Sequence, residues 1–137
     1  MSHGLLLDTC AIIFVTNDQN ISAPTATKIN EASNSGKLYL SPISSWEIGR
    51  SVASRRLSIA GDPLRFFLDF VKGASAKLCD MGPQTLVASS FLPGKIHRDP
   101  FDRILIETAR QNNLTLVTSD RAILAYGAEG HVKTLAC

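Results

Sequence analysis

Four acidic residues are spaced along the chain so that a single site can contain all of them: Asp8, Glu47, Asp102 and Asp120. Two of them follow short apolar runs, where strands would end, and the other two fall early in segments with helical spacing. Gathered carboxylates repel one another, so such a group requires a cation or raised pKa values. A hard divalent ion, Mg²⁺ or Mn²⁺, is the simplest neutraliser because it prefers oxygen ligands.

An all-oxygen metal site suits reactions at phosphorus. The bound ion can activate a water molecule and stabilise the charge on a phosphoryl group during in-line displacement. The chain has no Ser-His-Asp order, no phosphate-binding glycine loop and no HExxH motif, each of which would indicate other chemistry. Its three cysteines are odd in number and lack CxxC spacing, which argues against a disulfide framework or a zinc site.

Each acid also has a purely structural interpretation. Asp8 and Asp120 could cap the helices that follow them, and Asp102 would be favoured by the helix dipole at the third helical position. Glu47 would ordinarily be a solvated acid on a helix surface. Asp99 precedes a proline, and we expect capping to be its main role. The functional interpretation therefore depends on the joint location of the acids, not on any one of them.

Apolar runs alternate with helical segments along the whole chain. We expect strands at residues 5–7, 37–40, 77–81, 114–117 and 131–135. We expect helices at 11–15, 23–33, 64–71 and 122–125, and others that open at Gly82-Pro83 and Pro100, while Ser44 or Ser45 caps the helix with Glu47. This order predicts an α/β fold, a three-layer sandwich with a short central parallel sheet flanked by helices. Right-handed crossovers then place the carboxyl ends of all strands at the edge where such sheets bind ligands.

Length and composition limit the class of protein. The 137 residues, 45% apolar and 19% charged, predict one soluble domain over residues 1–137. No apolar run approaches the roughly 18 residues that a membrane-spanning helix needs, and no export signal is present, so we expect a cytoplasmic protein without a membrane partner. The formal charge of +2 neither demands nor excludes a nucleic-acid partner.

Arginines near the acidic segments and a few aromatic residues are further candidates for functional roles. Phosphates that enter an acidic site need positive walls, and arginines lie close to the acidic segments: Arg50, Arg98, Arg103 and Arg121. Each can equally belong to a soluble basic surface; Arg103 is favoured as a ligand contact because it follows Asp102, although it could pair with a carboxylate instead. We expect Trp46 in the core rather than as a base-stacking platform. Phe66 and Phe67 are candidates for a dimer surface.

Four segments together resemble the PIN-domain ribonucleases, and in order and spacing they are similar to the VapC-type toxins of type II toxin–antitoxin systems. They are LLLDT at 5–9, SSWEIGRSV at 44–52, HRDPFDRILIETA at 97–109 and LTLVTSD at 114–120. The match spans nearly the whole chain, and HRDPFDR is its most specific part.

The resemblance implies an endoribonuclease that cleaves single-stranded RNA with Mg²⁺ or Mn²⁺ and leaves a 5′-phosphate and a 3′-hydroxyl. The family's catalytic acids fall on Asp8, Glu47, Asp102 and Asp120. The metal ligands would be all of these except Glu47, which would complete a second, weaker metal position or act on the attacking water. Residues that would support the acids are Thr9, Asp99, Thr118 and Ser119, and Asp99 could itself approach the metal.

The resemblance further implies a homodimer that a cognate antitoxin inhibits by lying across the acidic groove. A PIN-like module that binds RNA or protein without cleaving it is the alternative, and the complete set of acids argues against it. A phosphatase with Asp8 as nucleophile would need an acid two residues later, where Cys10 stands.

Overall fold

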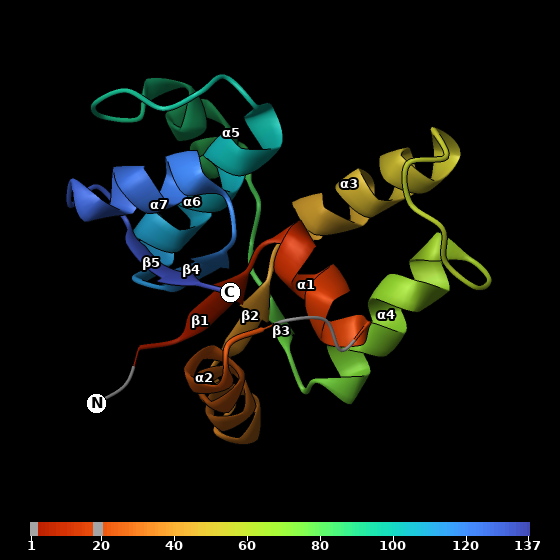
Figure 1. The fold of residues 1–137 in the computed structure, drawn as a ribbon. Coiled ribbons are helices and arrows are strands. Elements are labelled where there is room, and N and C mark those ends of the chain that lie inside the picture. Colours follow the sequence, from red (N-terminus) through yellow and green to blue (C-terminus); the bar gives the residue numbers. More distant parts are fainter. Residues whose placement is uncertain (1–2, 18–20) are drawn as a thin grey trace.

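The computed structural model describes residues 3–17 and 21–137, and its strands form one parallel sheet in the order β3-β2-β1-β4-β5 (Figure 1). The strands are β1 (Leu5–Leu7), β2 (Leu38–Leu40), β3 (Lys77–Leu78), β4 (Thr115–Thr118) and β5 (Lys133–Ala136). The helices are α1 (Thr9–Thr16), α2 (Ala23–Asn34), α3 (Pro42–Ala53), α4 (Pro63–Gly73), α5 (Pro83–Ala88), α6 (Pro100–Asn112) and α7 (Arg121–Ala128), with a 3-10 turn η1 (Ser89–Phe91). The predicted α/β fold is confirmed.

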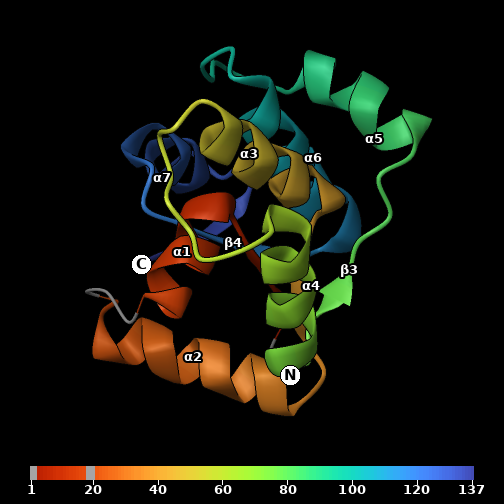
Figure 2. The same cartoon turned by 90° about the vertical axis from the view of Figure 1, so that its right-hand side faces the viewer.

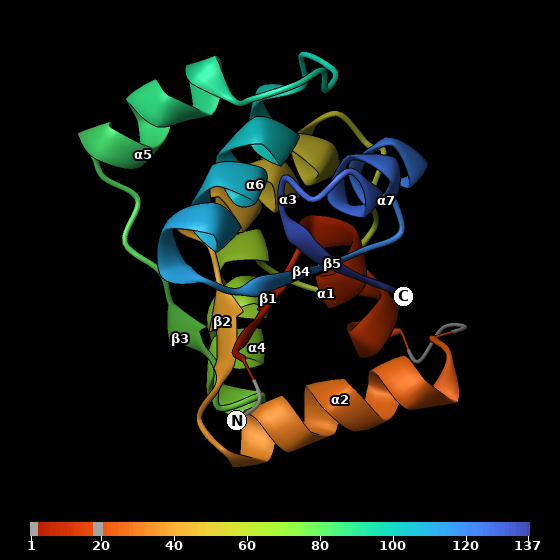
Figure 3. The same cartoon turned by 90° about the vertical axis from the view of Figure 1, so that its left-hand side faces the viewer.

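Helices cover both faces of the sheet and make two separate apolar cores. Helices α6 and α7 pack on one face, and α1, α2 and α4 pack on the other (Figures 1 and 3). Strand β1 serves both cores, because Leu6 faces the first while Leu5 and Leu7 face the second. All three leucines are buried. A strand that is apolar on both faces is typical of a covered parallel sheet.

Helix α3 lies at the boundary between the two cores. Its Ile43 joins the core under α6, and its Ile48 joins the core that contains α4. Figure 2 shows α3 between α6 and α4. This position at the carboxyl edge of the sheet brings α3 beside the ends of β1 and β4.

The start of α3 differs from the sequence prediction. Ser41, not Ser44 or Ser45, is the N-cap, and its hydroxyl accepts a hydrogen bond of 3.1 Å from the Ile43 amide. The reason is the proline at the first helical position, which lacks an amide hydrogen and has the backbone angle that a helix start requires. Glu47 therefore lies in the second turn of α3 and not at its start.

Three aromatic residues are placed differently from our expectations. Trp46 is 56% exposed, so the prediction that it belongs to the core is wrong. Phe67 is only 3% exposed and lies in the core, so it cannot form a dimer surface; Phe66 is partly buried and packs against that core. The exposed face of α4 carries Leu64 and Leu68 instead. In the part of the chain that the structure describes, no helix has the length and apolar character to cross a bilayer.

Candidate metal centre

Asp8 directly follows β1 at the carboxyl edge of the sheet. It is 5% exposed and caps α1, accepting a hydrogen bond of 2.7 Å from the Ala11 amide. Burial raises the pKa of Asp8 from 3.8 to about 6; hydrogen bonds from Thr118 and Ala11 lower this value, and the charges of Glu47 and Asp120 raise it further. A capping carboxylate is thus also part of a mutually repelling acidic group.

Asp120 follows β4, the strand beside β1. Its Oδ1 accepts a hydrogen bond of 3.0 Å from the Ile123 amide and so caps α7. Fully buried Thr118 fixes the preceding turn, because its hydroxyl accepts from the Asp120 amide at 3.0 Å. The same hydroxyl forms the hydrogen bond to the Asp8 side chain. Thr118 therefore connects two acids that lie more than a hundred residues apart in the chain.

Asp102 reaches this edge from α6, where it is the third helical residue as the sequence predicted. Its side chain is 18% exposed. Burial is the largest cause that raises the pKa of Asp102 to about 7, followed by the charges of Asp99, Asp120, Glu47 and Asp8. Three of these charges, those of Asp120, Glu47 and Asp8, belong to expected site residues. The fold therefore brings Asp8, Asp102 and Asp120 together, and half-buried Glu47 lies within electrostatic range of them.

His97, which we left out of the expected site residues, lies against two of the acids. Its Nε2 is 3.3 Å from Oδ2 of Asp102 and 3.7 Å from Oδ2 of Asp120. One ligand atom from each of these three side chains lies within 4.8 Å of the others, a spacing that fits a metal ion. Nδ1 of His97 is buried and has no hydrogen-bond partner in the described chain. The sequence did contain a signal, the continuous HRDPFDR segment. The chain turns at the start of α6, and this turn brings His97, the first residue of the segment, back beside Asp102.

Arg103 holds His97 in place through the backbone. Its Nε donates to the Ser89 carbonyl at 2.9 Å, Nη1 donates to the carbonyls of Ile96 and His97 at 3.3 Å, and Nη2 donates to the Ser90 carbonyl at 3.4 Å. We had favoured this arginine as a ligand contact or a partner of a carboxylate. Its guanidinium instead attaches η1 and the following loop to α6.

Other residues from the sequence analysis occupy the margin of the centre. Thr9 donates from its hydroxyl to that of Ser44 at 3.0 Å and so joins α1 to α3. Asp99 is exposed and accepts from the Phe101 amide at 2.9 Å, which confirms its predicted capping role. The remaining candidates have exposed side chains: Arg50, Arg98, Ser119 and Arg121.

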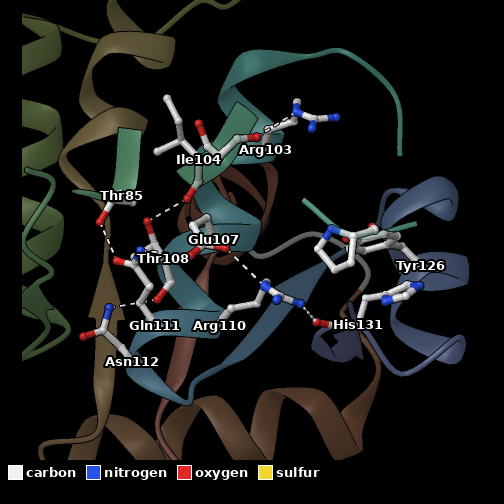
Figure 4. A network of polar contacts seen from close by, with 12 residues as sticks. Thr85, Arg103, Ile104, Glu107, Thr108, Arg110, Gln111, Asn112, Tyr126 and His131 are labelled. Carbon is white, nitrogen blue, oxygen red and sulfur yellow. Dashed lines mark hydrogen bonds and ion pairs between the residues drawn. The ribbon is translucent and has the colours of Figure 1, made fainter. Parts of the chain in front are cut away.

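Glu107 is a buried acid outside the metal centre, and neighbouring side chains of the protein compensate its charge. This buried carboxylate accepts from Nε of Arg110 at 3.1 Å and from Nε2 of Gln111 at 2.9 Å (Figure 4). Thr85 donates in turn to Gln111 at 2.7 Å. By contrast, no ion pair in the described part of the chain joins any of the four site acids to a lysine or arginine. The acidic group at the sheet edge is thus left for an external cation.

The chain matches known proteins in family and in fold. The family model described as the PIN domain matches residues 5–129. VapBC2 from Rickettsia felis, solved with a DNA fragment from its promoter, aligns with a TM-score of 0.70 at 14% identity, covering 96% of this chain and 97% of the other. FitAcB from Neisseria gonorrhoeae aligns with 0.58 at 18% identity, covering 96% of each.

FitAB bound to an IR36 DNA fragment aligns with a TM-score of 0.55 at 20% identity, covering 96% of this chain and 94% of the other. These structural neighbours are VapC- and FitB-type toxins of toxin–antitoxin complexes. No curated protein sequence matches the chain. At these identities the neighbours establish the fold, and the chemistry must be argued from the residues of this chain.

Proposed function

This chain belongs to the PIN-domain family, and we propose from this premise that it is a metal-dependent endoribonuclease that cleaves single-stranded RNA. The observation that carries the proposal is the acidic centre itself. Asp102 and Asp120 lie against His97, the charges of Asp8 and Glu47 act on the same group, and among the described residues no lysine or arginine forms an ion pair with these acids. Residues 1–137 would form a single nuclease domain.

The donor set fits a divalent ion. Burial first, and then the charges of neighbouring carboxylates, raise the pKa values of Asp8 and Asp102, and a bound cation would stabilise their ionised forms. Asp8, Asp102 and Asp120 would hold Mg²⁺ or Mn²⁺, with His97 beside them. When bound, such an ion polarises a phosphoryl oxygen and activates water for in-line displacement.

The protein's own residues supply orientation and proton transfer. Thr118 hydrogen-bonds Asp8 and the Asp120 backbone, and so fixes the spacing between two carboxylates. Glu47 makes no hydrogen bond or ion pair in the described chain and is half-buried, so its carboxylate is free to accept a proton from the attacking water. The exposed Arg98 and Arg121 adjoin the site in sequence and would contact the RNA phosphates.

We place this ribonuclease in a toxin–antitoxin pair. Structural neighbours have been crystallised with their VapB and FitA partners and with DNA. By analogy the chain would form a homodimer, a cognate antitoxin would cover its acidic centre, and its RNA substrate would be cellular RNA in the cytoplasm. The alternative is a PIN-like module that binds RNA or protein without cleavage.

The proposal is tested by incubating the purified protein with single-stranded RNA and Mg²⁺ or Mn²⁺. We expect products with a 5′-phosphate and a 3′-hydroxyl, complete loss of cleavage in excess EDTA, and loss in Asp8→Asn, whose amide still caps α1. Asp69→Asn, which changes an exposed acid on α4, is the matched control and should cleave normally. Cleavage that persists in excess EDTA would contradict the metal mechanism. Binding of RNA without cleavage by the metal-loaded wild type would favour the alternative.

A further inference from the structure

An exposed aromatic pair lies where α3 meets α6. Trp46 is 56% exposed, and its ring centroid is 5.0 Å from that of Phe101, with 60° between the ring planes. Phe101 is half-buried and packs against the core under α6, so the indole has a fixed support. Single exposed apolar residues are common on protein surfaces. Trp46 differs from such residues because Phe101 holds its indole in a fixed position on the surface.

Arg50 completes the cluster. Its guanidinium carbon is 5.7 Å from the centroid of Trp46, one helical turn earlier on α3, and 5.8 Å from that of Phe101. Arg50 also lies three residues after Glu47, a spacing that commonly gives an ion pair on a helix. No such pair is present among the described residues. The cation lies against the rings and leaves the site acid uncompensated.

The cluster is adjacent in sequence to two site acids. Trp46 directly precedes Glu47, and Phe101 directly precedes Asp102. The two helices that bring Trp46 against Phe101 also bring Glu47 within electrostatic range of Asp102, so a strand whose phosphate is held at the acidic centre would have a neighbouring nucleotide near the aromatic pair. We infer that Trp46, Phe101 and Arg50 form a stacking platform for an unpaired nucleobase of the RNA substrate. This inference depends on the proposed function and adds to it a binding position for a base beside the scissile phosphate.

The chemistry of the cluster favours a nucleobase over other ligands. Bases of single-stranded RNA stack on aromatic rings and on guanidinium planes, and both are present here. The charge of Arg50 is complementary to the adjoining phosphate. Stacking also explains selection for single strands, because a paired base has no free face to offer. A protein partner that covers the same rings is the competing occupant, and the experiment separates the two.

Trp46 is the only tryptophan in the chain, so its fluorescence reports directly on the platform. The probe is a short single-stranded oligoribonucleotide of mixed sequence, titrated with Mg²⁺ into full-length Asp8→Asn protein, which the proposed function predicts to be inactive. An abasic oligonucleotide with the same backbone is the comparison ligand. We expect quenching by the RNA and little quenching by the abasic strand.

Variants with cleavage-competent acids provide the second measurement. Trp46→Ala should weaken RNA binding about tenfold and raise KM more than it lowers kcat, because one stacked base contributes about 1–3 kcal/mol. Trp46→Phe should restore most of the affinity. Phe91→Ala removes an aromatic side chain that is 80% exposed and forms no ring contact in the described chain, so it is the matched control and should bind normally.

The outcomes distinguish this inference from the proposed function. If wild type neither binds nor cleaves RNA, the proposed function fails and the inference fails with it. If RNA is cleaved normally by Trp46→Ala, or the abasic strand quenches as strongly as RNA, the platform is wrong while the nuclease stands. If Trp46→Ala loses only its antitoxin affinity, the surface belongs to a protein partner and the inference is overturned.

Discussion

Replacing Asp102 by asparagine should stabilise the metal-free protein, although it removes a residue that the proposed function requires. Burial and four neighbouring carboxylates raise the pKa of Asp102 from 3.8 to about 7. The folded protein therefore binds this proton more tightly than the unfolded chain does. The resulting stabilisation is fully present below about pH 4 and is lost as the pH rises through about 7. Asparagine is uncharged throughout and avoids that loss.

The size of the effect follows from the same values. A pKa of 3.8 in the unfolded chain and about 7 in the folded protein corresponds to roughly 4 kcal/mol, at about 1.4 kcal/mol for each pKa unit. The side chain is still 18% exposed, and water screens part of the repulsion, so we expect about half of this value, ~2 kcal/mol. For a chain of this length that is a rise in Tm of roughly 6–8 °C.

The assay is thermal unfolding in excess EDTA at about pH 4.5 and about pH 8. Asp102→Asn should melt near the wild type at the lower pH and well above it at the higher pH. Asp69→Asn, an exposed acid on α4, should follow the wild type at both. A variant that is no more stable than wild type at the higher pH, or equally stabilised at both, would refute the electrostatic reasoning.

Three further predictions concern the surroundings of Asp102. Mn²⁺ should raise the Tm of wild type and raise that of Asp102→Asn much less, because the ion binds the folded state through this carboxylate; equal shifts would exclude it as a ligand. Asp102→Asn should lose about 100-fold in cleavage rate, whereas Asp99→Asn should lose little. Asp99→Ala should cost about 1 kcal/mol of stability through the lost cap. If Asp99→Asn loses metal affinity by calorimetry while Asp102→Asn keeps it, the roles of the two residues are exchanged. Arg103→Lys should lower the free energy of unfolding by about 1–3 kcal/mol and broaden the His97 ring signals in NMR, and unchanged signals would show that the loop does not need this anchor.

The positions of the acids were accessible from sequence because they depend on local rules. Asp8 and Asp120 follow apolar runs that could only be strands, and parallel strands end at a common edge. Asp102 follows a proline that marks a helix start. These signals depend on a few neighbouring residues, so the packing of the rest of the chain does not change them.

The residues that sequence reasoning misplaced depend on contacts between distant elements. Trp46 lies on α3 at the boundary between two cores, so the apolar pattern of the helix does not decide which residue faces solvent. His97 enters the acidic centre from a loop whose path no periodicity predicts. Arg103 was expected to contact a ligand because it follows Asp102, whereas its guanidinium binds four main-chain carbonyls of residues 89–97. In each case the position of the side chain depends on which residues of another element pack against it, and the sequence pattern does not give those residues.

The attachment of the 89–97 segment to Arg103 has a consequence for how this protein can diverge. Every contact from the guanidinium goes to a carbonyl oxygen, and every residue type supplies one. The exposed positions of this segment, Phe91 and Lys95 among them, can therefore change while its path, and with it the place of His97, is retained; Leu92 is fixed by its burial in the core and Gly94 by its positive φ. Related chains should accordingly vary at the exposed positions of the segment and keep the arginine. Such a loop lets the exposed surface change during evolution without moving His97 away from Asp102 and Asp120.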